Sequence, residues 1–212
     1  MSEIFVRPYR PSDEETIRRI CCDTALYGQP IDSLFGDRPL VADALLWYYT
    51  QFERDALFIA DAQGQAAGYL SGCLDTHRFE SIFARRVLPR LLWRCIRRGH
   101  GFRGAFWRLA LAGYASAGRW LRVQGRVMAD YPAHCHINLD TSFRHSGTGS
   151  ALLEAFLNYM RAHGVRGIHV ITATEGGKAL FSKAGFTLLT KYLAPEFPGT
   201  AARDTWVMGR YA

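Results

Sequence analysis

Long apolar runs are missing from this sequence. Hydrophobic residues make up 49% of its 212 residues, yet no uninterrupted stretch approaches the roughly 18–20 residues that a membrane-spanning helix requires. The N-terminus, MSEIFVRPYRPSDEE, lacks the apolar core of a secretory signal. We therefore expect a soluble, cytoplasmic protein.

Paired cysteine motifs are missing as well. The chain has five cysteines, an odd number, and none of them form a C-x-x-C pair. This pattern argues against a disulfide framework and favours a reducing compartment. A chain of this length buries about 70% of its unfolded surface in one core, so we expect a single domain, residues 1–212.

Acidic residues are scarce between residues 78 and 126. This segment contains twelve arginines and one acid, Glu80, so it carries +11 while the rest of the chain carries −4. Apolar residues recur at helical spacing, which predicts a basic helical segment over 78–128, kinked at Pro89. Three interpretations stay open: a lid or dimer element, a contact with an anionic membrane surface, or nucleic-acid binding, the least favoured because no reader motif is present. The apolar positions are Ile82, Val87, Leu91, Leu92, Cys95 and Ile96, then Phe102, Phe106, Trp107, Leu109 and Leu111.

The most informative stretch runs from Ala133 to Phe156. Ala133–Leu139 alternates like a half-buried strand, and a helical apolar face follows before Gly164 ends the helix. Between them, Arg144–Ser150 (RHSGTGS) supplies glycines and free N–H groups at the positive end of a helix dipole, which predicts a diphosphate site. The helical face consists of Leu152, Leu153, Phe156, Leu157 and Met160.

Three phosphate-binding loops compete for this motif. A Walker A loop ends in Gly-Lys-Ser/Thr, which is absent. A dinucleotide loop needs a further small residue and a later acid, where this chain has Leu152 and Val170. The remaining pattern, Arg-x-x-Gly-x-Gly, resembles the acetyl-CoA loop of the GNAT (Gcn5-related) N-acetyltransferase superfamily.

The resemblance extends to the order of elements. The strand and helix patterns on both sides of the loop follow the family's order across nearly the whole chain. The family implies an α/β fold, with a mixed, mostly antiparallel central sheet of six to seven strands flanked by helices, and makes 78–128 a helical Arg-rich insertion. These patterns are strand Ile4–Arg10, helix Asp13–Thr24, hairpin Leu57–Asp61 and Ala66–Leu74 around Gln63-Gly64, strand Gly167–Thr174 and helix Gly176–Phe186.

A narrower resemblance is to bacterial acetyltransferases related to the C-terminal acetyltransferase-like domain of O-GlcNAcase. The segments that carry it are Thr24-Ala25, Gly68-Tyr69-Leu70, Leu74-Asp75-Thr76, Tyr131–His136 and Val207–Arg210. Some members of that branch lack the glycine loop, which this chain retains.

The resemblance implies acetyl-CoA as acetyl donor, without a metal. Backbone N–H groups near Leu139 and Asp140 would face the acetyl oxygen, and Thr174 would contact the pantetheine. The family's usual Tyr, which protonates the coenzyme sulfur, is replaced by Phe181; water, Ser182 or Tyr192 would substitute, or the thiolate would leave without an acid. The expected coenzyme-binding loop residues are Arg144, His145, Ser146, Gly147, Thr148, Gly149 and Ser150.

Candidate proton acceptors lie on the preceding strand. His134, His136, Asn138 and Asp140 are two residues apart, so an unbroken strand would project them to one face. A neutral histidine accepts a proton near pH 7, and the Ala-His-Cys-His sequence resembles the arylalkylamine N-acetyltransferase branch. There, however, the pair lies one residue farther from the loop.

The same residues have simpler interpretations. Structural hydrogen bonds for His134 and His136, and a capping role for Asp140, stay open. A metal site on the two histidines is disfavoured because no further ligand has suitable spacing. Asp75 is a candidate for binding a substrate ammonium, or a plain turn residue.

Two functions therefore remain. The first is acetyl-CoA-dependent N-acetylation of a primary amine on a small molecule, amino sugar or protein lysine, with His136 and either His134 or Asp140 moving the proton. The second is a catalytically weak or inactive acyl-CoA-binding scaffold that uses the Arg-rich insertion for interaction.

Overall fold

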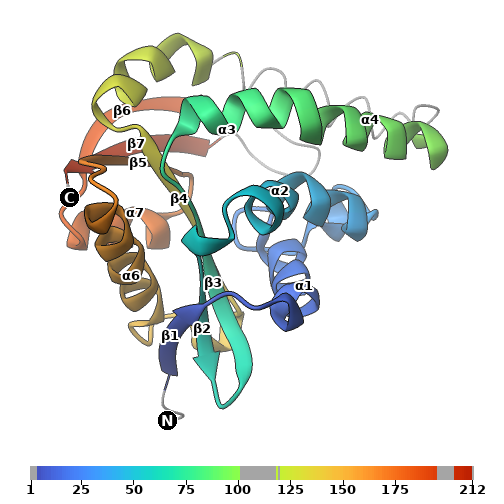
Figure 1. The fold of residues 1–212 in the computed structure, drawn as a ribbon, viewed down its shortest axis with the longest axis horizontal. Coiled ribbons are helices and arrows are strands. Elements are labelled where there is room, and N and C mark those ends of the chain that lie inside the picture. The colour runs from blue at the N-terminus through green and yellow to red at the C-terminus, as the bar shows by residue number, and fades with distance from the viewer. Residues whose placement is uncertain (1–3, 101–117, 119, 195–202, 212) are drawn as a thin grey trace.

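The chain folds into a seven-stranded sheet with helices on both faces (Figure 1). The computed structural model describes residues 4–100, 118, 120–194 and 203–211. The strands are β1 Ile4–Pro8, β2 Leu57–Ala62, β3 Gln65–Cys73, β4 Ala133–Leu139, β5 Gly167–Thr172, β6 Thr187–Ala194 and β7 Arg203–Tyr211. The longer helices are α1 Glu14–Thr24, α2 Arg38–Phe52, α3 Thr76–Ile82, α4 Leu88–Arg97, a helix over 120–130, α6 Thr148–Ala162 and α7 Glu175–Lys183.

The strand order is β1-β2-β3-β4-β5-β7-β6. All neighbouring strands pair antiparallel except β4 and β5, which are parallel. This is the mixed, mostly antiparallel sheet that the family resemblance implies. In Figure 1, α6 and α7 lie on one side of the sheet and α1 and α2 on the other.

The β2–β3 hairpin turns where the sequence predicts it. Gln63 and Gly64 both adopt positive φ, 55° and 87°. Two consecutive left-handed residues make a turn whose twist matches that of the flanking strands. The turn therefore sets the register of β2 against β3 where the two strands leave it.

Helix α6 packs on the sheet through the predicted apolar face. All five residues of that face are buried, and they join Ala133 and Cys135 of β4 in the main core. Gly164 follows the helix at φ 69°, the left-handed conformation that often ends a helix. This packing fixes the N-terminus of α6 next to the end of β4.

The first helices of the basic segment begin two residues earlier than the predicted segment and include an irregular turn. Helix begins at Thr76, and α3 continues through a π-helical turn, Phe83–Val87, into α4. The irregularity lies before Pro89, because proline lacks an N–H and its ring crowds the preceding turn. The second predicted apolar face, Phe102 to Leu111, falls outside the described residues. None of the helices described is both long and apolar enough to cross a membrane.

Candidate active site

The sheet separates between β4 and β5. Only two residue pairs join these strands, Ala133 with Ile168 and His134 with His169. Beyond them β4 continues beside β3 alone, through the pairs from Ser71–His136 to Gly68–Leu139. The carboxyl ends of two parallel strands thus diverge, the position where open α/β sheets commonly bind ligands.

Backbone polar groups of β4 face this separation. The Asp140 N–H donates to Ala67 O at 3.0 Å, so it is not available to a ligand as the sequence suggested. Because successive N–H groups in an antiparallel pair alternate in direction, the N–H groups of Ile137 and Leu139 point away from β3. Leu139 is therefore the better-placed candidate donor to an acetyl oxygen.

The loop after β4 presents further N–H groups. Gly147, at φ 85°, is the N-cap of α6. The first helical bond runs from Ala151 N to Gly147 O, which leaves the N–H groups of Thr148, Gly149 and Ser150 without an intrahelical partner. Together with the helix dipole, these donors make the kind of helix N-terminus at which anions commonly bind.

The two loop glycines serve different purposes. A Cβ at Gly147 would meet nothing within 4 Å, so glycine is needed there for its backbone conformation. A Cβ at Gly149 would lie 3.2 Å from a methyl of Leu180 and 3.6 Å from one of Leu139. Gly149 therefore lets α6 approach α7 and β4 closely.

Arginines surround the same end of the sheet. Arg144 donates to Gly28 O at 3.0 Å, in the loop between α1 and α2. The Arg203 guanidinium lies 4.9 Å from the ring centre of Tyr27 in that loop. Both cations add positive potential near the loop.

The predicted histidine row faces α1 and α2. The Asn138 amide donates to Thr24 Oγ1 of α1 at 2.5 Å, and His134 meets the Tyr49 hydroxyl of α2. His136 lies with its ring centre 5.7 Å from that of His134. The strand thus brings His134, His136 and Asn138 to one face, whereas Asp140 lies past the end of the strand.

The hydrogen-bond network assigns the tautomer of His134. The Thr76 hydroxyl donates to Pro132 O at 2.6 Å, so its oxygen accepts from His134 Nδ1–H at 2.7 Å. His134 Nε2 then accepts the Tyr49 O–H at 3.0 Å. Burial, followed by His136 and His169, lowers the pKa of His134 well below its usual range. Both ring nitrogens are engaged, so His134 positions its neighbours and has no free lone pair for a substrate proton.

His136 is the histidine of this row with a free ring. It contacts the Tyr49 and His134 rings edge-on and makes no hydrogen bond to the described residues. Desolvation, with a smaller contribution from His169, lowers the pKa of His136 to about 4. The side chain is nevertheless exposed to water, which offsets part of that desolvation. Because the pKa is lowered and not raised, the ring is neutral at pH 7. A neutral ring with solvent access can accept a proton.

Asp140 is held in a capping role. Its carboxylate accepts from Ser142 N at 3.2 Å and pairs with Arg19 at 3.3 Å. Partial burial raises the pKa of Asp140, but these hydrogen bonds outweigh that effect and hold it below the usual value. A carboxylate stabilised as an anion is a poor proton acceptor, so the geometry favours the capping interpretation.

Two further candidates are also helix caps. Asp75 accepts from Arg78 N at 3.1 Å and is the N-cap of α3, so its carboxylate is already engaged. Thr174 caps α7 by accepting from Gly177 N at 3.1 Å. Phe181 is buried in the main core, with its ring centre 5.3 Å from that of Phe186. Phe181 is therefore a packing residue at the position where the resemblance implies a tyrosine.

Three participants were not assigned a role from the sequence. Tyr49 and Thr76 fix His134, and His169 lies beside it, 5.8 Å between ring centres. Tyr49 reads as an ordinary core aromatic in a helix, and only its distance in space to β4 reveals its role. For His169, the signal was that the two strands that pair in parallel, β4 and β5, both contain histidine. In the described part of the chain, no group of three His, Cys, Asp or Glu residues is arranged to hold a metal ion.

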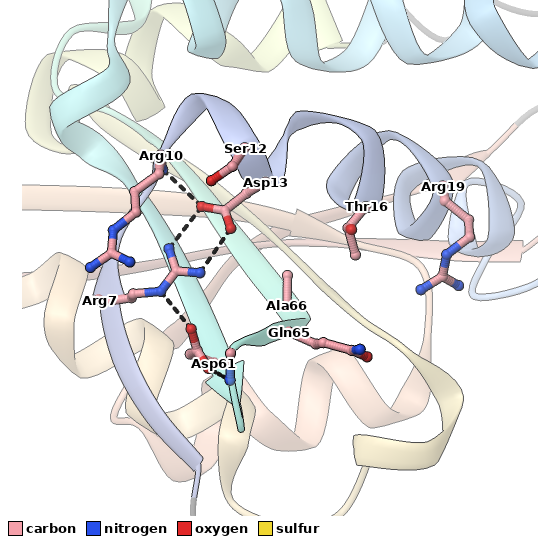
Figure 2. A pocket seen from close by; sticks show the side chains of 10 residues that line it. Arg7, Arg10, Ser12, Asp13, Thr16, Arg19, Asp61, Gln65 and Ala66 are labelled. Atoms are coloured by element: carbon pink, nitrogen blue, oxygen red, sulfur yellow. Dashed lines mark hydrogen bonds and ion pairs between the residues drawn. The ribbon is translucent and has the colours of Figure 1, made fainter.

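A separate polar hollow lies between α1 and the β2–β3 turn (Figure 2). The Arg7 guanidinium occupies its wall and bonds both Asp13, at 2.8 Å, and Asp61, at 2.6 Å. All three side chains are buried. The single guanidinium bonds both carboxylates, and no residue of the histidine row or coenzyme loop lines the hollow. We assign this ion triad to holding β1, β2 and the start of α1 together.

Removal of the Tyr49 hydroxyl should lower stability. Tyr49→Phe leaves His134 Nε2 buried without its donor, which costs about 1–3 kcal/mol of the free energy of unfolding. Tyr159→Phe is the control, because the Tyr159 hydroxyl makes no hydrogen bond to the described residues. Urea denaturation of both variants measures the difference; equal losses would show that the hydroxyl of Tyr49 contributes nothing to holding His134.

Stability should fall as the pH is lowered from 7 to 5. Burial lowers the pKa of both His134 and His169 below the ordinary value of about 6.5. Below pH 6.5 the unfolded chain binds protons that these folded residues do not, so each contributes a slope of up to about 1.4 kcal/mol per pH unit. His169→Gln should reduce the slope, whereas His77→Gln, on exposed α3 surface, should not. A free energy of unfolding that is constant over this range would contradict the assignment.

Solved structures with the same architecture match almost the whole chain, although no family model matches it. A crystal structure of a protein designated SsHAT is 26% identical, with a TM-score of 0.72 over 99% of this chain and 98% of that chain. A polyamine N-acetyltransferase from Drosophila melanogaster is 13% identical, with a TM-score of 0.62 over 99% and 100%. A GNAT superfamily phosphinothricin acetyltransferase from Sinorhizobium meliloti, in complex with acetyl-CoA, is 19% identical, with a TM-score of 0.61 over 100% and 89%. The split sheet, the glycine loop and these likenesses together establish that this chain has the α/β fold of GNAT N-acetyltransferases.

Proposed function

We propose that this protein is an acetyl-CoA-dependent N-acetyltransferase acting on a primary amine. One observation carries the proposal: the separation of β4 from β5 lies between the free N–H groups that begin α6 and the accessible His136. An anion site, a polarising donor and a proton acceptor are thus parts of one strand–loop–helix unit. These are the groups that acetyl transfer requires.

The acetyl donor would bind along β4. Its diphosphate would accept from the N–H groups of Thr148, Gly149 and Ser150, with Arg144 close by. The remaining loop residues His145, Ser146 and Gly147 shape this turn. The Leu139 N–H, directed away from β3, would donate to the acetyl oxygen as negative charge develops there.

His136 would remove the proton from the acceptor. The amine nitrogen attacks the acetyl carbon, the carbon–sulfur bond breaks, and the proton leaves the nitrogen for His136, directly or through water. Because desolvation lowers the pKa of His136, the ring is neutral and available to accept a proton at pH 7. His134, held by Tyr49 and Thr76, would keep the neighbouring ring in place.

The coenzyme sulfur would leave as a thiolate. Phe181 supplies no proton, and a thiol with a pKa near 8.5 is a good leaving group. Water or the exposed Ser182 can protonate the thiolate afterwards. The reaction is therefore compatible with the loss of the usual tyrosine.

The acceptor belongs to the class of primary amines. A small-molecule amine is favoured because structural neighbours include polyamine and phosphinothricin acetyltransferases. An amino sugar or a protein lysine offers the same nucleophile. On the sequence segments quoted above, we propose that the chain belongs with the bacterial acetyltransferases related to the O-GlcNAcase domain, and that it acts in the cytoplasm.

A binding module is the second candidate. Phe181 in the core and the weakly basic His136 both favour a protein that binds acetyl-CoA without rapid turnover. Residues 78–128 would then supply the interaction surface.

Release of free thiol from acetyl-CoA distinguishes the two. The full chain would be incubated with acetyl-CoA and a panel of diamines, amino sugars and lysine peptides. Amine-dependent thiol release supports the enzyme. Saturable acetyl-CoA binding in calorimetry, with no thiol release above the blank on any amine, supports the module.

A further inference from the structure

The outward face of α4 is apolar. Its large side chains are exposed by 42% at Leu88, 49% at Leu92, 60% at Trp93 and 70% at Ile96. Leu88, Leu92 and Ile96 are four residues apart and so form one line along the helix. We call these four residues the outer face of α4.

The opposite side of α4 is anchored to the body of the protein. Cys95 is buried with Phe35 and Leu40, next to Leu91. Arg94 forms an ion pair with Asp43 of α2, and Arg98 forms one with Asp37 at the start of α2. In Figure 1, α3 and α4 follow one another along the edge of the molecule, with α2 beside them. These contacts fix the rotation of α4 about its axis, so its outer face points away from the other described elements.

Unpaired arginines border this face. Arg85, Arg86 and Arg97 are exposed and have no carboxylate partner among the described residues. Arg90 is also exposed and lies over the Trp47 ring at 5.0 Å. Glu80 is the one acid in the sequence from 78 to 126. The surface therefore combines large apolar side chains with uncompensated positive charge.

We propose that the outer face of α4 docks on an anionic lipid bilayer. A helix lying in the interface buries its apolar side chains at the acyl boundary while arginines at its margins meet lipid phosphates. Trp93 suits this boundary because its ring combines an apolar body with a polar N–H. Docking is independent of the acetyl-transfer proposal.

A second copy of the chain fits this surface less well. A symmetric dimer through the outer face would bring the arginines of one protomer against those of the other. Like charges at such a contact are repulsive, whereas lipid phosphates complement them. The charge pattern thus selects the membrane surface as the occupant.

Co-sedimentation with vesicles tests the proposal. The full chain should sediment with vesicles of equal parts phosphatidylserine and phosphatidylcholine, should bind less as salt is raised, and should not bind phosphatidylcholine alone. Leu92→Glu/Ile96→Glu should abolish binding, and Arg86→Gln and Arg97→Gln should each weaken it about fivefold. Leu188→Glu, at a 56% exposed leucine on β6, should bind like the wild type.

Three results would overturn the proposal. One is the absence of sedimentation with anionic vesicles. Another is equal binding of anionic vesicles by the wild type and Leu92→Glu/Ile96→Glu, which would show that the apolar side chains of this face do not contribute. The third is a dimer in analytical ultracentrifugation that the same double variant dissociates, which would assign the face to a second copy.

Discussion

Gly147→Glu should abolish acetyl-CoA binding. Gly147 caps α6 at φ 85°, beside the N–H groups that would hold the diphosphate. A glutamate there adds bulk and places a negative charge close to phosphate oxygens, a repulsion that amounts to about 4 kcal/mol at 4 Å in a partly screened site. We expect the Kd measured by calorimetry to rise by at least about a hundredfold.

Gly164→Glu is the matched control. Gly164 follows the other end of the same helix, has φ 69°, and likewise meets nothing within 4 Å. Both substitutions therefore carry a similar cost, about 1–2 kcal/mol, for a left-handed non-glycine residue. If Gly164→Glu loses acetyl-CoA as completely as Gly147→Glu, the effect comes from destabilised folding and the loop assignment fails.

His136→Ala should retain acetyl-CoA binding and lower kcat. General acid–base catalysis contributes about 10²–10⁴-fold, so kcat should fall within that range. His136 lies on the α1–α2 face of β4 and not in the loop, which is why the Kd for acetyl-CoA should change little. Turnover of the substrate found in the amine panel, with thiol release as readout, measures the loss.

The pH dependence sharpens this test. Because desolvation lowers the pKa of His136 below its usual value, the pH profile of the wild type should show no inflection at or above pH 6.5. The rate should instead rise toward the pKa of the acceptor amine. His77→Ala, on exposed α3 surface, should match the wild type. Unchanged turnover of His136→Ala from about pH 6 to 9 would remove His136 from the mechanism.

Much of the fold followed from periodicity. Strand β4 and the buried face of α6 are as predicted because alternation and helical spacing are strong in these segments. The β2–β3 turn could be predicted because Gly64 readily adopts left-handed backbone between two alternating apolar segments. The π-helical turn before Pro89 could not be predicted from the sequence, since its position depends on how the helix packs as well as on the proline.

The site was predictable only in part. The loop could be recognised because its glycines have local backbone reasons, φ 85° at Gly147 and close packing at Gly149. The different roles of His134 and His136 could not be predicted from the sequence. They depend on Tyr49 and Thr76, which are 85 and 58 residues from His134. Asp140 and Asp75 illustrate the same point: spacing placed them near the site, and local N–H groups then engaged them as caps.

A crystal structure of the full chain with acetyl-CoA tests the central claim most directly. We predict diphosphate oxygens within hydrogen-bond distance of the N–H groups of Thr148, Gly149 and Ser150, the acetyl oxygen at the Leu139 N–H, and the acetyl carbon on the side of β4 reached by His136. A coenzyme bound away from the β4–β5 separation, or an acetyl group that His136 cannot reach even through one water, would contradict the account.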